Sequence, residues 1–264
     1  MGLVHLAFHG GAILLFGSLI AERVPLWPLL MVPQGILIVF LFTLLHESIH
    51  RTAFKTRRLN DGVAWICAVM IALPPEWFRD FHFAHHRFTQ DPENDPELAE
   101  PKPETAIQYF VHLSGLPTWY SHLKTLGLNA SSGRGAVRTE ARIMIAIYAA
   151  LTGLSFLSGS TVLLYAWVIP AVLGQPALRL YLLAEHTGCP KLPNMLENTR
   201  TVLTNRLIRK IAWNMPYHTE HHTYPAVPFH RLPDLHAVMA DRLQHIEPGY
   251  RSFHRRYFSS LVSR

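Results

Sequence analysis

Residues 214–222 read Asn-Met-Pro-Tyr-His-Thr-Glu-His-His and lie near the start of the last fifth of the chain. The histidines in this stretch, His218, His221 and His222, are spaced i, i+3 and i+4. A helix with this spacing turns its side chains to one side, and we expect the three imidazoles to converge on one point. Neutral imidazole is the commonest metal ligand in proteins. The stretch therefore predicts a metal site.

The same histidine spacing recurs in residues 82–86, an i, i+4 pair occupies 46–50, and one more histidine ends a long apolar run. These places together hold nine of the chain's 17 histidines: His46, His50, His82, His85, His86, His186, His218, His221 and His222. Nine ligands are too many for one tetrahedral ion, so two metals fit better than one. Histidine-rich sites with no evident carboxylate bridge suit iron or another first-row transition metal.

The composition indicates a membrane protein. Of the 264 residues, 49% are hydrophobic and only 16% are charged, and the mean hydropathy is +0.14. A soluble domain carries about a quarter charged residues. Four apolar runs are long enough to be read as membrane spans: 3–21, 29–45, 141–157 and 161–183.

Two of these spans need comment. The first lacks a basic segment before it and a small-residue cleavage site after it, so we interpret it as a retained span and not as a signal peptide. The fourth contains Pro170 and Gly174, which we expect to kink it. The sequence predicts an all-α integral membrane protein, a single domain over residues 1–264, with about four transmembrane helices.

The remaining residues, 46–138 and 184–264, are expected to form a cytosolic cap that carries the histidines. Residues 63–73 are apolar but too short to span, and 76–90 and 105–113 fit helices that lie at the membrane surface. We expect a solvated loop at 91–97, a flexible linker at 129–135 and a helix at 234–245.

Charge gives the expected orientation. Basic residues follow the second span and precede the third, so both segments face the cytoplasm by the positive-inside rule: Arg51, Lys55, Arg57, Arg58, Arg134, Arg138 and Arg142. All four histidine clusters then lie on the cytoplasmic side. The net charge of +6 suits anionic lipid headgroups or an acidic redox partner, and no basic stripe with interleaved aromatics indicates nucleic acid. The two cysteines, Cys67 and Cys189, are too few for a fused rubredoxin or iron–sulfur donor.

Taken together, His46-Glu-Ser-Ile-His50, His82-Phe-Ala-His-His86 and His218-Thr-Glu-His-His222 resemble the three histidine boxes of the membrane fatty acid desaturase and hydroxylase superfamily. The resemblance extends from about residue 43 to residue 233. It implies a centre of two non-haem irons on the cytosolic face that uses O2 to attack an unactivated C–H bond. His186 resembles an extra ligand that several members supply, although Leu182 stands where some desaturases place an Asn.

The resemblance also implies partners and leaves the reaction open. Electrons would come from an external donor such as a ferredoxin, a rubredoxin, or a b-type cytochrome with its reductase. Desaturation of a fatty acyl (lipid) chain is the leading interpretation. A hydroxylase or ketolase acting on an alkane, a carotenoid or a small molecule would share the same boxes.

Two interpretations from other functional classes, a protease and a metal transporter or sensor, compete with the desaturase interpretation. His46-Glu47-Ser-Ile-His50 matches the HExxH pattern of a zinc metalloprotease, in which the glutamate activates water. That reading leaves both histidine triplets unexplained. A metal transporter or sensor would place its ligands within the bilayer between several spans, whereas here the histidines gather beyond the helix ends.

Acidic residues beside the histidines are candidates to orient the imidazoles. Glu47, Glu185 and Glu220 are each adjacent to a proposed ligand and are expected to accept N–H bonds from it. Asp91 and Asp95 rank behind them. We interpret Arg179, near the end of the fourth span, as a snorkelling side chain and not as a clamp for a substrate carboxylate.

Overall fold

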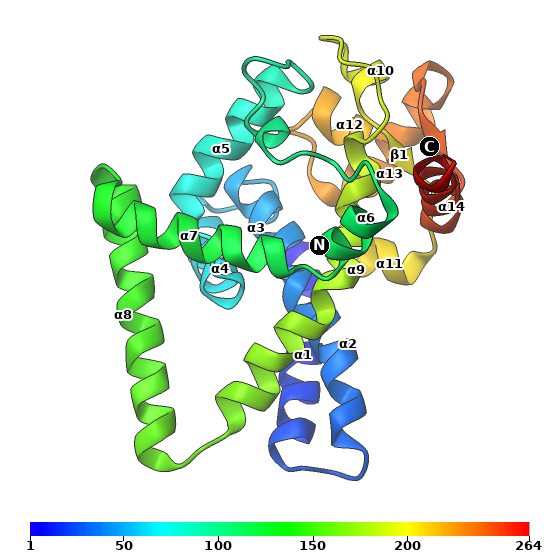
Figure 1. Ribbon diagram of the computed structural model, residues 1–264. Helices are drawn as coiled ribbons and strands as arrows, with labels where there is room; N and C mark the ends of the chain where they lie inside the picture. Colours follow the sequence, from blue (N-terminus) through cyan, green and yellow to red (C-terminus); the bar gives the residue numbers. More distant parts are fainter. Residues whose placement is uncertain (264) are drawn as a thin grey trace.

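The computed structural model describes residues 1–263 and is built almost entirely from helices. Four of the helices are long and apolar enough to cross a membrane: Gly2–Ala21, Trp27–Ile49, Gly135–Ser158 and Leu164–His186. Figure 1 shows them projecting from one side of a cap made of shorter helices. The all-α membrane architecture with four spans is therefore confirmed. The second and third helices are longer than the apolar runs that predicted them, because polar residues continue each helix into the cap.

The spanning helices form two hairpins whose turns lie at the end away from the cap (Figure 1). The first hairpin joins α1 (Gly2–Ala21) to α2 (Trp27–Val39), which continues into the cap as α3 (Leu41–Ile49). The second joins α8 (Gly135–Ser158) to α9 (Ile169–His186). Arg23 in the first turn donates a hydrogen bond to Thr161 in the second over 3.2 Å. This hydrogen bond links the ends of the two hairpins.

α2 and α9 touch backbone to backbone through two glycines. A Cβ atom added to Gly174 would collide with the backbone of Gly35, and one added to Gly35 would collide with the carbonyl of Pro170. Small residues at such a crossing let membrane helices approach closely. The kink expected at Pro170 stays a prediction; the helix has a widened π-helical turn, Leu164–Val168, which Ile169 separates from the proline. Gly174 serves as the contact point with α2.

The surface helices of the cap begin close to where the sequence placed them. α5 (Pro75–Phe88) and α6 (Ala106–Leu113) match the expected ranges within two residues. α4 (Arg57–Ile71) begins earlier than expected because the Thr56 hydroxyl accepts a hydrogen bond from Leu59 N–H and caps the helix. A short 3₁₀ turn, η1 (Pro96–Ala99), follows the loop after α5.

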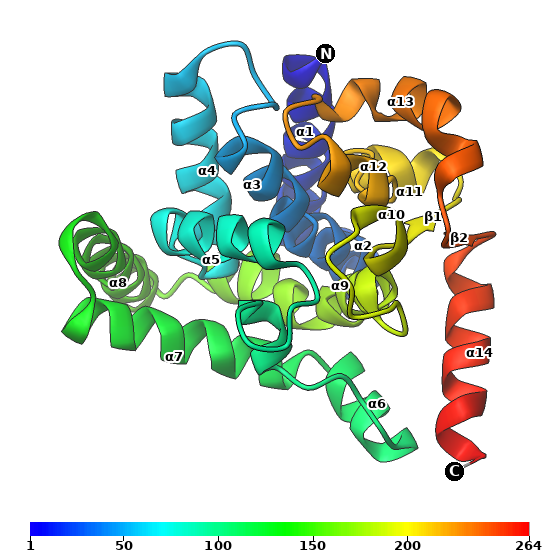
Figure 2. The ribbon, with the colours of Figure 1, turned by 90° about the horizontal axis from the view of Figure 1, so that it is seen from above.

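The flexible linker expected at 129–135 is wrong. α7 (Leu116–Ser132) runs through most of it, and only Gly133 and Arg134 separate α7 from α8. The Ser131 and Ser132 hydroxyls donate to backbone carbonyls of the preceding turn, including that of Leu128 at 2.8–3.0 Å. These hydrogen bonds let serines that usually favour turns remain inside a helix. In Figure 2, α7 and α8 lie on one flank of α3 and the last third of the chain lies on the other.

The last third of the chain, from residue 189, folds as short elements around α12 (His218–Thr223). They are α10 (Met195–Asn198), β1 (Thr201–Val202), α11 (Arg206–Ile211), η3 (Phe229–Arg231), α13 (Leu232–Met239), η4 (Ala240–Arg242), β2 (Ile246–Glu247) and α14 (Tyr250–Val262). β1 and β2 form a parallel pair. The helix expected at 234–245 ends early, because the His245 carbonyl accepts a hydrogen bond from Thr201 N–H at 3.0 Å in that pair.

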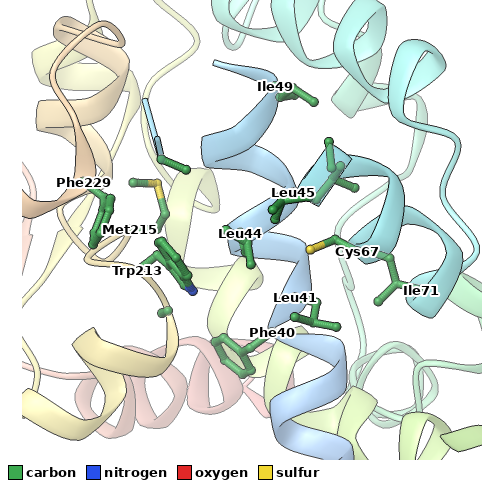
Figure 3. Packing of buried hydrophobic residues seen from close by; sticks show 14 of the residues in the cluster. Phe40, Leu41, Leu44, Leu45, Ile49, Cys67, Ile71, Trp213, Met215 and Phe229 are labelled. Carbon is green, nitrogen blue, oxygen red and sulfur yellow. The ribbon is translucent and has the colours of Figure 1, made fainter. Parts of the chain in front are cut away.

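The buried core surrounds α3, the helix that carries the first histidine pair (Figure 3). Leu44, Leu45 and Ile49 of α3 pack against Cys67 and Ile71 of α4, and against a segment from the last third of the chain. The residues of that segment labelled in Figure 3 are Trp213, Met215 and Phe229. Burying one such large side chain contributes about 1.5–3 kcal/mol. Packing on both sides fixes α3 and therefore the imidazoles at its end.

Candidate metal centre

Four helices bring all nine predicted histidines together. His46 and His50 come from the end of α3, three from α5, His186 from the last residue of α9, and three from α12. Seven of the nine are buried, and His50 and His86 are half-buried. No single element holds the site, so it forms only when the spanning helices and the last third of the chain are packed together.

The first group contains five histidines whose ligand atoms all lie within 4.8 Å of one another: His46, His50, His82, His86 and His221. The Nε2 atoms of four of them face one another. His82 Nε2 lies 3.0 Å from His50 Nε2 and 2.8 Å from His86 Nε2. His221 Nε2 lies 3.1 Å from His86 Nε2.

The second group contains His85, His186 and His222, again within 4.8 Å of one another. His85 Nε2 lies 3.3 Å from His186 Nε2. His218 stands beside this group, with its Nε2 atom 3.0 Å from that of His186. The rings of His86 and His222 stack at a centroid distance of 4.1 Å and so join the two groups.

The expectation that each triplet would converge on one point is wrong. On α5, His82 and His86 belong to the first group and His85 to the second; on α12, His221 belongs to the first group and His222 to the second. Consecutive residues of a helix point about 100° apart. Adjacent histidines such as His85 and His86 therefore diverge toward two centres. Each triplet spans two sites instead of forming one.

The donor set fits transition-metal ions. Two imidazole nitrogens bound to one ion at ~2.0–2.1 Å are about 3 Å apart, and the inward Nε2 atoms lie 2.8–3.3 Å apart. Several buried ring nitrogens have no hydrogen-bond partner among the described residues, including both nitrogens of His46 and Nε2 of His222. Buried polar atoms rarely stay unpaired. A ligand that these nitrogens bind directly explains them.

Burial also keeps the imidazoles in the form that binds metals. Burial, followed by repulsion from neighbouring imidazoles, holds the pKa values of His82, His218, His221 and His222 well below the usual value. The same causes lower the pKa of His86 to about 2. These side chains are therefore neutral at physiological pH, and only a neutral imidazole offers a lone pair to a metal ion.

The pKa of His85 is shifted in the opposite direction because two carboxylates lie beside it. Burial lowers its pKa, but Glu97 and Asp95 outweigh burial and raise it. His85 Nδ1–H donates to Asp95 Oδ1 at 2.9 Å, while Glu97 Oε2 lies 3.2 Å from the inward-facing Nε2 atom. Lys102 pairs with the other oxygen of Glu97 at 2.9 Å. Asp95 therefore orients the imidazole, as carboxylates commonly do for metal ligands.

These acids differ from those favoured by the sequence. The sequence does not indicate Glu97, and it places Asp95 behind the three glutamates, because both acids lie in a proline-rich stretch expected to be solvated. The structure folds that stretch back over α5, where Asp95 accepts hydrogen bonds from Gln90 N–H and Glu97 N–H. The available signal was an aspartate followed by proline and glutamate soon after the second box. Asp91 lies apart and contacts Glu93 and Asn94.

The three glutamates proposed to orient imidazoles have different partners. Only Glu185 faces one of the nine histidines, at 3.5 Å from His218 Nδ1. Glu47 is fully buried and accepts from the Thr52 hydroxyl at 2.7 Å and from Phe229 N–H at 3.2 Å. Glu220 accepts from the Thr201 hydroxyl and from His236. Glu47 and Glu220 therefore tie segments of the cap together.

Neutral groups orient two further imidazoles, and sequence patterns gave no sign of them. His186 Nδ1–H donates to the Asn198 carbonyl at 3.1 Å, and His222 Nδ1–H donates to the Thr89 hydroxyl at 3.2 Å. The Asn198 side chain in turn donates to the Thr89 carbonyl at 3.0 Å. This link joins α5, α9 and α10 behind the second group. Both imidazoles thus present Nε2 to the centre.

A cavity of about 300 Å³ opens beside the two groups. Its wall includes His46, His82, His85 and His218, and aromatic side chains of α3 and α5 complete much of the rest: Phe42, Trp77, Phe78 and Phe81. α7 and α9 close the other side with polar residues and with Arg179 and Leu182. The cavity therefore brings an apolar surface directly against the imidazoles of both groups.

Comparison with known proteins gives consistent matches. A profile described as fatty acid desaturase matches residues 23–254. The chain is 28% identical to dihydrorhizobitoxine desaturase of Bradyrhizobium elkanii over 85% of its own length and 69% of that protein's. It is 24% identical to an endoplasmic reticulum acyl-lipid omega-3 desaturase (cytochrome b5) of Arabidopsis thaliana, over 79% of this chain and 62% of that protein.

A third relative is a sphingolipid delta(4)-desaturase of Drosophila melanogaster, 25% identical over 77% of this chain and 63% of that protein. The chain thus spans between three fifths and seven tenths of the length of these relatives. All three carry desaturase names, and the named compounds or lipids differ from one to the next.

Proposed function

The chain belongs to the fatty acid desaturase family, and from that premise we propose that it is a membrane di-iron enzyme that desaturates a fatty acyl chain with O2 and external electrons. The observation that carries the proposal is the shared cavity, because imidazoles of both histidine groups and a wall of aromatic side chains line the same space. An apolar methylene chain in that space would lie against the metal centre.

The residues that would hold the irons follow from the two groups. His46, His50, His82, His86 and His221 would hold one ion, and His85, His186 and His222, with His218 beside them, the other. Iron in such a site supplies the activation of O2 that lets an unactivated C–H bond be attacked. Asp95, the Asn198 carbonyl and the Thr89 hydroxyl each hold the Nδ1–H of one imidazole and so fix which nitrogen faces inward.

The cavity wall supplies positioning. Phe42, Phe78 and Phe81 present apolar surface on the side of α3 and α5, and Leu182 does so from α9. Apolar walls favour a methylene chain over water at about 25 cal/mol for each Å² removed from solvent. Holding the chain in one place puts a chosen C–H bond beside the imidazoles and keeps water from competing.

Electrons would enter from the outer side of the first group. A shallow depression there exposes edges of His50 and His86 and is lined by Phe83, Arg87 and Pro225. Basic residues of the nearby 51–58 segment suit an acidic redox protein, and one relative carries cytochrome b5 in its name. By the same basic residues we infer that this face is cytoplasmic.

The zinc protease reading lacks support in the contacts of Glu47. Its carboxylate is fully buried, and one oxygen is already bound by Thr52 and Phe229. A glutamate that activates water must reach a water molecule at the metal. Hydroxylation, in contrast, would use the same site as desaturation, so only the product separates these two reactions.

Product analysis tests the proposal. The chain is expressed with iron in a host whose lipids lack polyunsaturated acyl chains, and the extracted acyl chains are analysed by mass spectrometry after double-bond derivatisation. We expect a new double bond that His85→Ala abolishes while the protein remains in the membrane. A new hydroxyl group in place of the double bond would assign the chain to the hydroxylases, and unchanged lipids with cleaved membrane proteins would reverse the proposal.

A further inference from the structure

Arg179 is a cationic side chain in the cavity that makes no hydrogen bond or ion pair with any residue from 1 to 263. Its Nε atom is buried. Other charged groups of the region are paired: Lys102 contacts Glu97 at 2.9 Å, and Arg200 donates to the Ala184 carbonyl at 2.5 Å. The residue as a whole is half-buried, and an unpaired guanidinium that has lost part of its hydration is costly. Its donors therefore indicate a partner that enters the cavity.

The position of Arg179 on α9 relates it to the metal centre. Arg179, Leu182 and His186 are spaced i, i+3 and i+7 and so share one face of the helix. A rise of 1.5 Å per residue puts Arg179 about 10 Å before His186 along the helix axis. Leu182 lies between them in the cavity wall. The cavity thus has a cationic end and a histidine end, with apolar surface between.

Other charges around the cavity leave the guanidinium free. Glu97 is neutralised by Lys102, and Glu100 accepts a hydrogen bond from the Ser121 hydroxyl at 2.9 Å. Glu185 faces His218. These three carboxylates attract Arg179 only at longer range than an ion pair.

A second unpaired nitrogen lines the same cavity, and it donates in the tautomer that carries the proton on Nε2. The Nε2 atom of His112 is buried and without a hydrogen-bond partner among the described residues, and its imidazole is close enough to feel the charge of Arg179. Two unused donors near one another suit an acceptor with more than one oxygen. Carboxylates and phosphates have that geometry, and arginine binds them with two parallel hydrogen bonds.

The place of Arg179 in the cavity wall argues against the snorkelling role that the sequence indicates. We propose instead that Arg179 binds an anionic head group of the substrate, a carboxylate or a phosphate, and that the apolar chain runs from it to the histidine groups. The inference rests on the proposed function, since it assigns one end of that substrate. An extended chain advances about 1.2 Å per bond, so ~10 Å corresponds to roughly eight or nine bonds. Arg179 would then determine which carbon of the chain meets the metal centre.

Binding of three probes with the same chain tests the inference without turnover. Octanoate, octyl phosphate and octanol are titrated by calorimetry into the full-length protein in a non-ionic detergent. We expect both anions to bind at least tenfold more tightly than octanol, and the tighter of the two identifies the head group. Arg179→Gln should weaken binding of the anions about 30-fold, as expected for a hydrogen-bonded charge pair, and leave octanol unchanged.

Two variants act as controls. Arg138→Gln makes the same change on an exposed part of α8 and should alter nothing. Arg179→Lys keeps the charge and should retain part of the anion binding. Loss of octanol binding in Arg179→Gln as well would mean that the cavity had collapsed in that variant. Anion binding by Arg179→Lys would then be the test, and loss of anion binding in Arg179→Lys would overturn the inference.

Equal binding of all three probes to the unaltered protein would overturn the assignment of an anion site, as would unchanged anion binding in Arg179→Gln. The iron content of each preparation is measured in parallel. Protein without iron that still prefers the anions would contradict the di-iron function but not the anion site. Protein that holds two irons and binds the anions no more tightly than octanol would support the di-iron function and contradict the anion site.

Discussion

Asp95 illustrates how a single side chain outside the ligand set supports the centre. Its carboxylate is almost completely buried and accepts hydrogen bonds from His85 Nδ1–H, Gln90 N–H and Glu97 N–H. It therefore fixes both the imidazole and the loop that brings Glu97 to the site. A carboxylate in this position makes its imidazole a stronger ligand.

We expect Asp95→Asn to weaken iron binding at the second group by about 10- to 100-fold, the usual cost of losing such a partner. The measurement is the rate at which a chelator removes iron from protein purified in detergent. Asp91→Asn is the matched control, because Asp91 lies in the same loop and its carboxylate accepts hydrogen bonds from Glu93 N–H and the Asn94 side chain, not from a histidine. Equal iron loss from both variants would show that Asp95 acts on the loop and not on His85.

Glu47 is a buried carboxylate whose role separates a structural function from a catalytic one. Its carboxylate accepts from Thr52 and Phe229, and glutamine keeps an acceptor oxygen at the same place. Glu47→Gln should retain iron and measurable desaturation, with a loss of stability of about 1 kcal/mol. Complete loss of activity with metal still bound would instead indicate that Glu47 takes part in the chemistry, as in a zinc protease.

At the level of helices, the crossing of α2 and α9 sets the position of His186. Gly35 and Gly174 allow the two backbones to touch, and a Cβ atom on either has no room. Because α9 ends at His186, a displacement at this crossing moves an imidazole of the second group. Packing within the membrane is thus coupled to the histidine groups in the cap.

Gly174→Ala should destabilise the protein by about 1–3 kcal/mol, the range found when atoms are forced into a packed contact. Gly153→Ala is the matched control: Gly153 lies inside α8, and an added Cβ meets nothing within 4 Å. Alanine there should be neutral or stabilising, since glycine is a poor helix former. Thermal unfolding in detergent measures both. Equal unfolding midpoints for the Gly174→Ala and Gly153→Ala proteins would mean that α2 and α9 can move apart without loss of stability.

The elements that the sequence predicted best are those with the strongest local signals. Apolar runs gave four spans, and the amphipathic pattern of 76–90 gave α5. The linker expected at 129–135 was wrong because serine hydroxyls bonded to carbonyls of the same helix. The helix expected at 234–245 was cut short by a strand partner more than 40 residues away. Contacts of these two kinds leave no periodic pattern in the sequence.

Over the whole molecule, the buried imidazoles link stability to pH. The pKa values of His82, His218, His221 and His222 lie well below their ordinary value of 6.5 because of burial and mutual repulsion. Below pH 6.5 the unfolded chain therefore binds protons that the folded chain does not. Folding stability must fall as the pH falls, by up to about 1.4 kcal/mol per pH unit for each such group. His85, whose pKa is raised, acts in the opposite direction.

For iron-free protein we expect the free energy of unfolding to drop by at least about 2 kcal/mol between pH 6.5 and pH 5.5. Thermal unfolding in detergent across that range measures it. His82→Gln removes one of the responsible groups and should make the dependence shallower. A midpoint that stayed constant, or rose on acidification, would show that the imidazoles are not buried as neutral groups.

The histidines of the site were predictable from sequence because their spacing is local, whereas their division between two groups was not. That division depends on how α5 and α12 face each other, which α2, α3 and α9 determine through the packing of the membrane hairpins. The cavity and the free guanidinium of Arg179 likewise arise only when α5, α7 and α9 are brought together. Which residues bind metal, and how many ions they hold, remain predictions that the geometry supports.

The most direct test of the di-iron account is the metal content per chain of protein purified in detergent from cells supplied with iron, measured by mass spectrometry. We predict close to two irons per chain. His82→Ala should deplete the first group and His85→Ala the second, while His245→Ala, outside both groups, should change nothing. About one zinc per chain with no iron, unaffected by His85→Ala, would contradict the account.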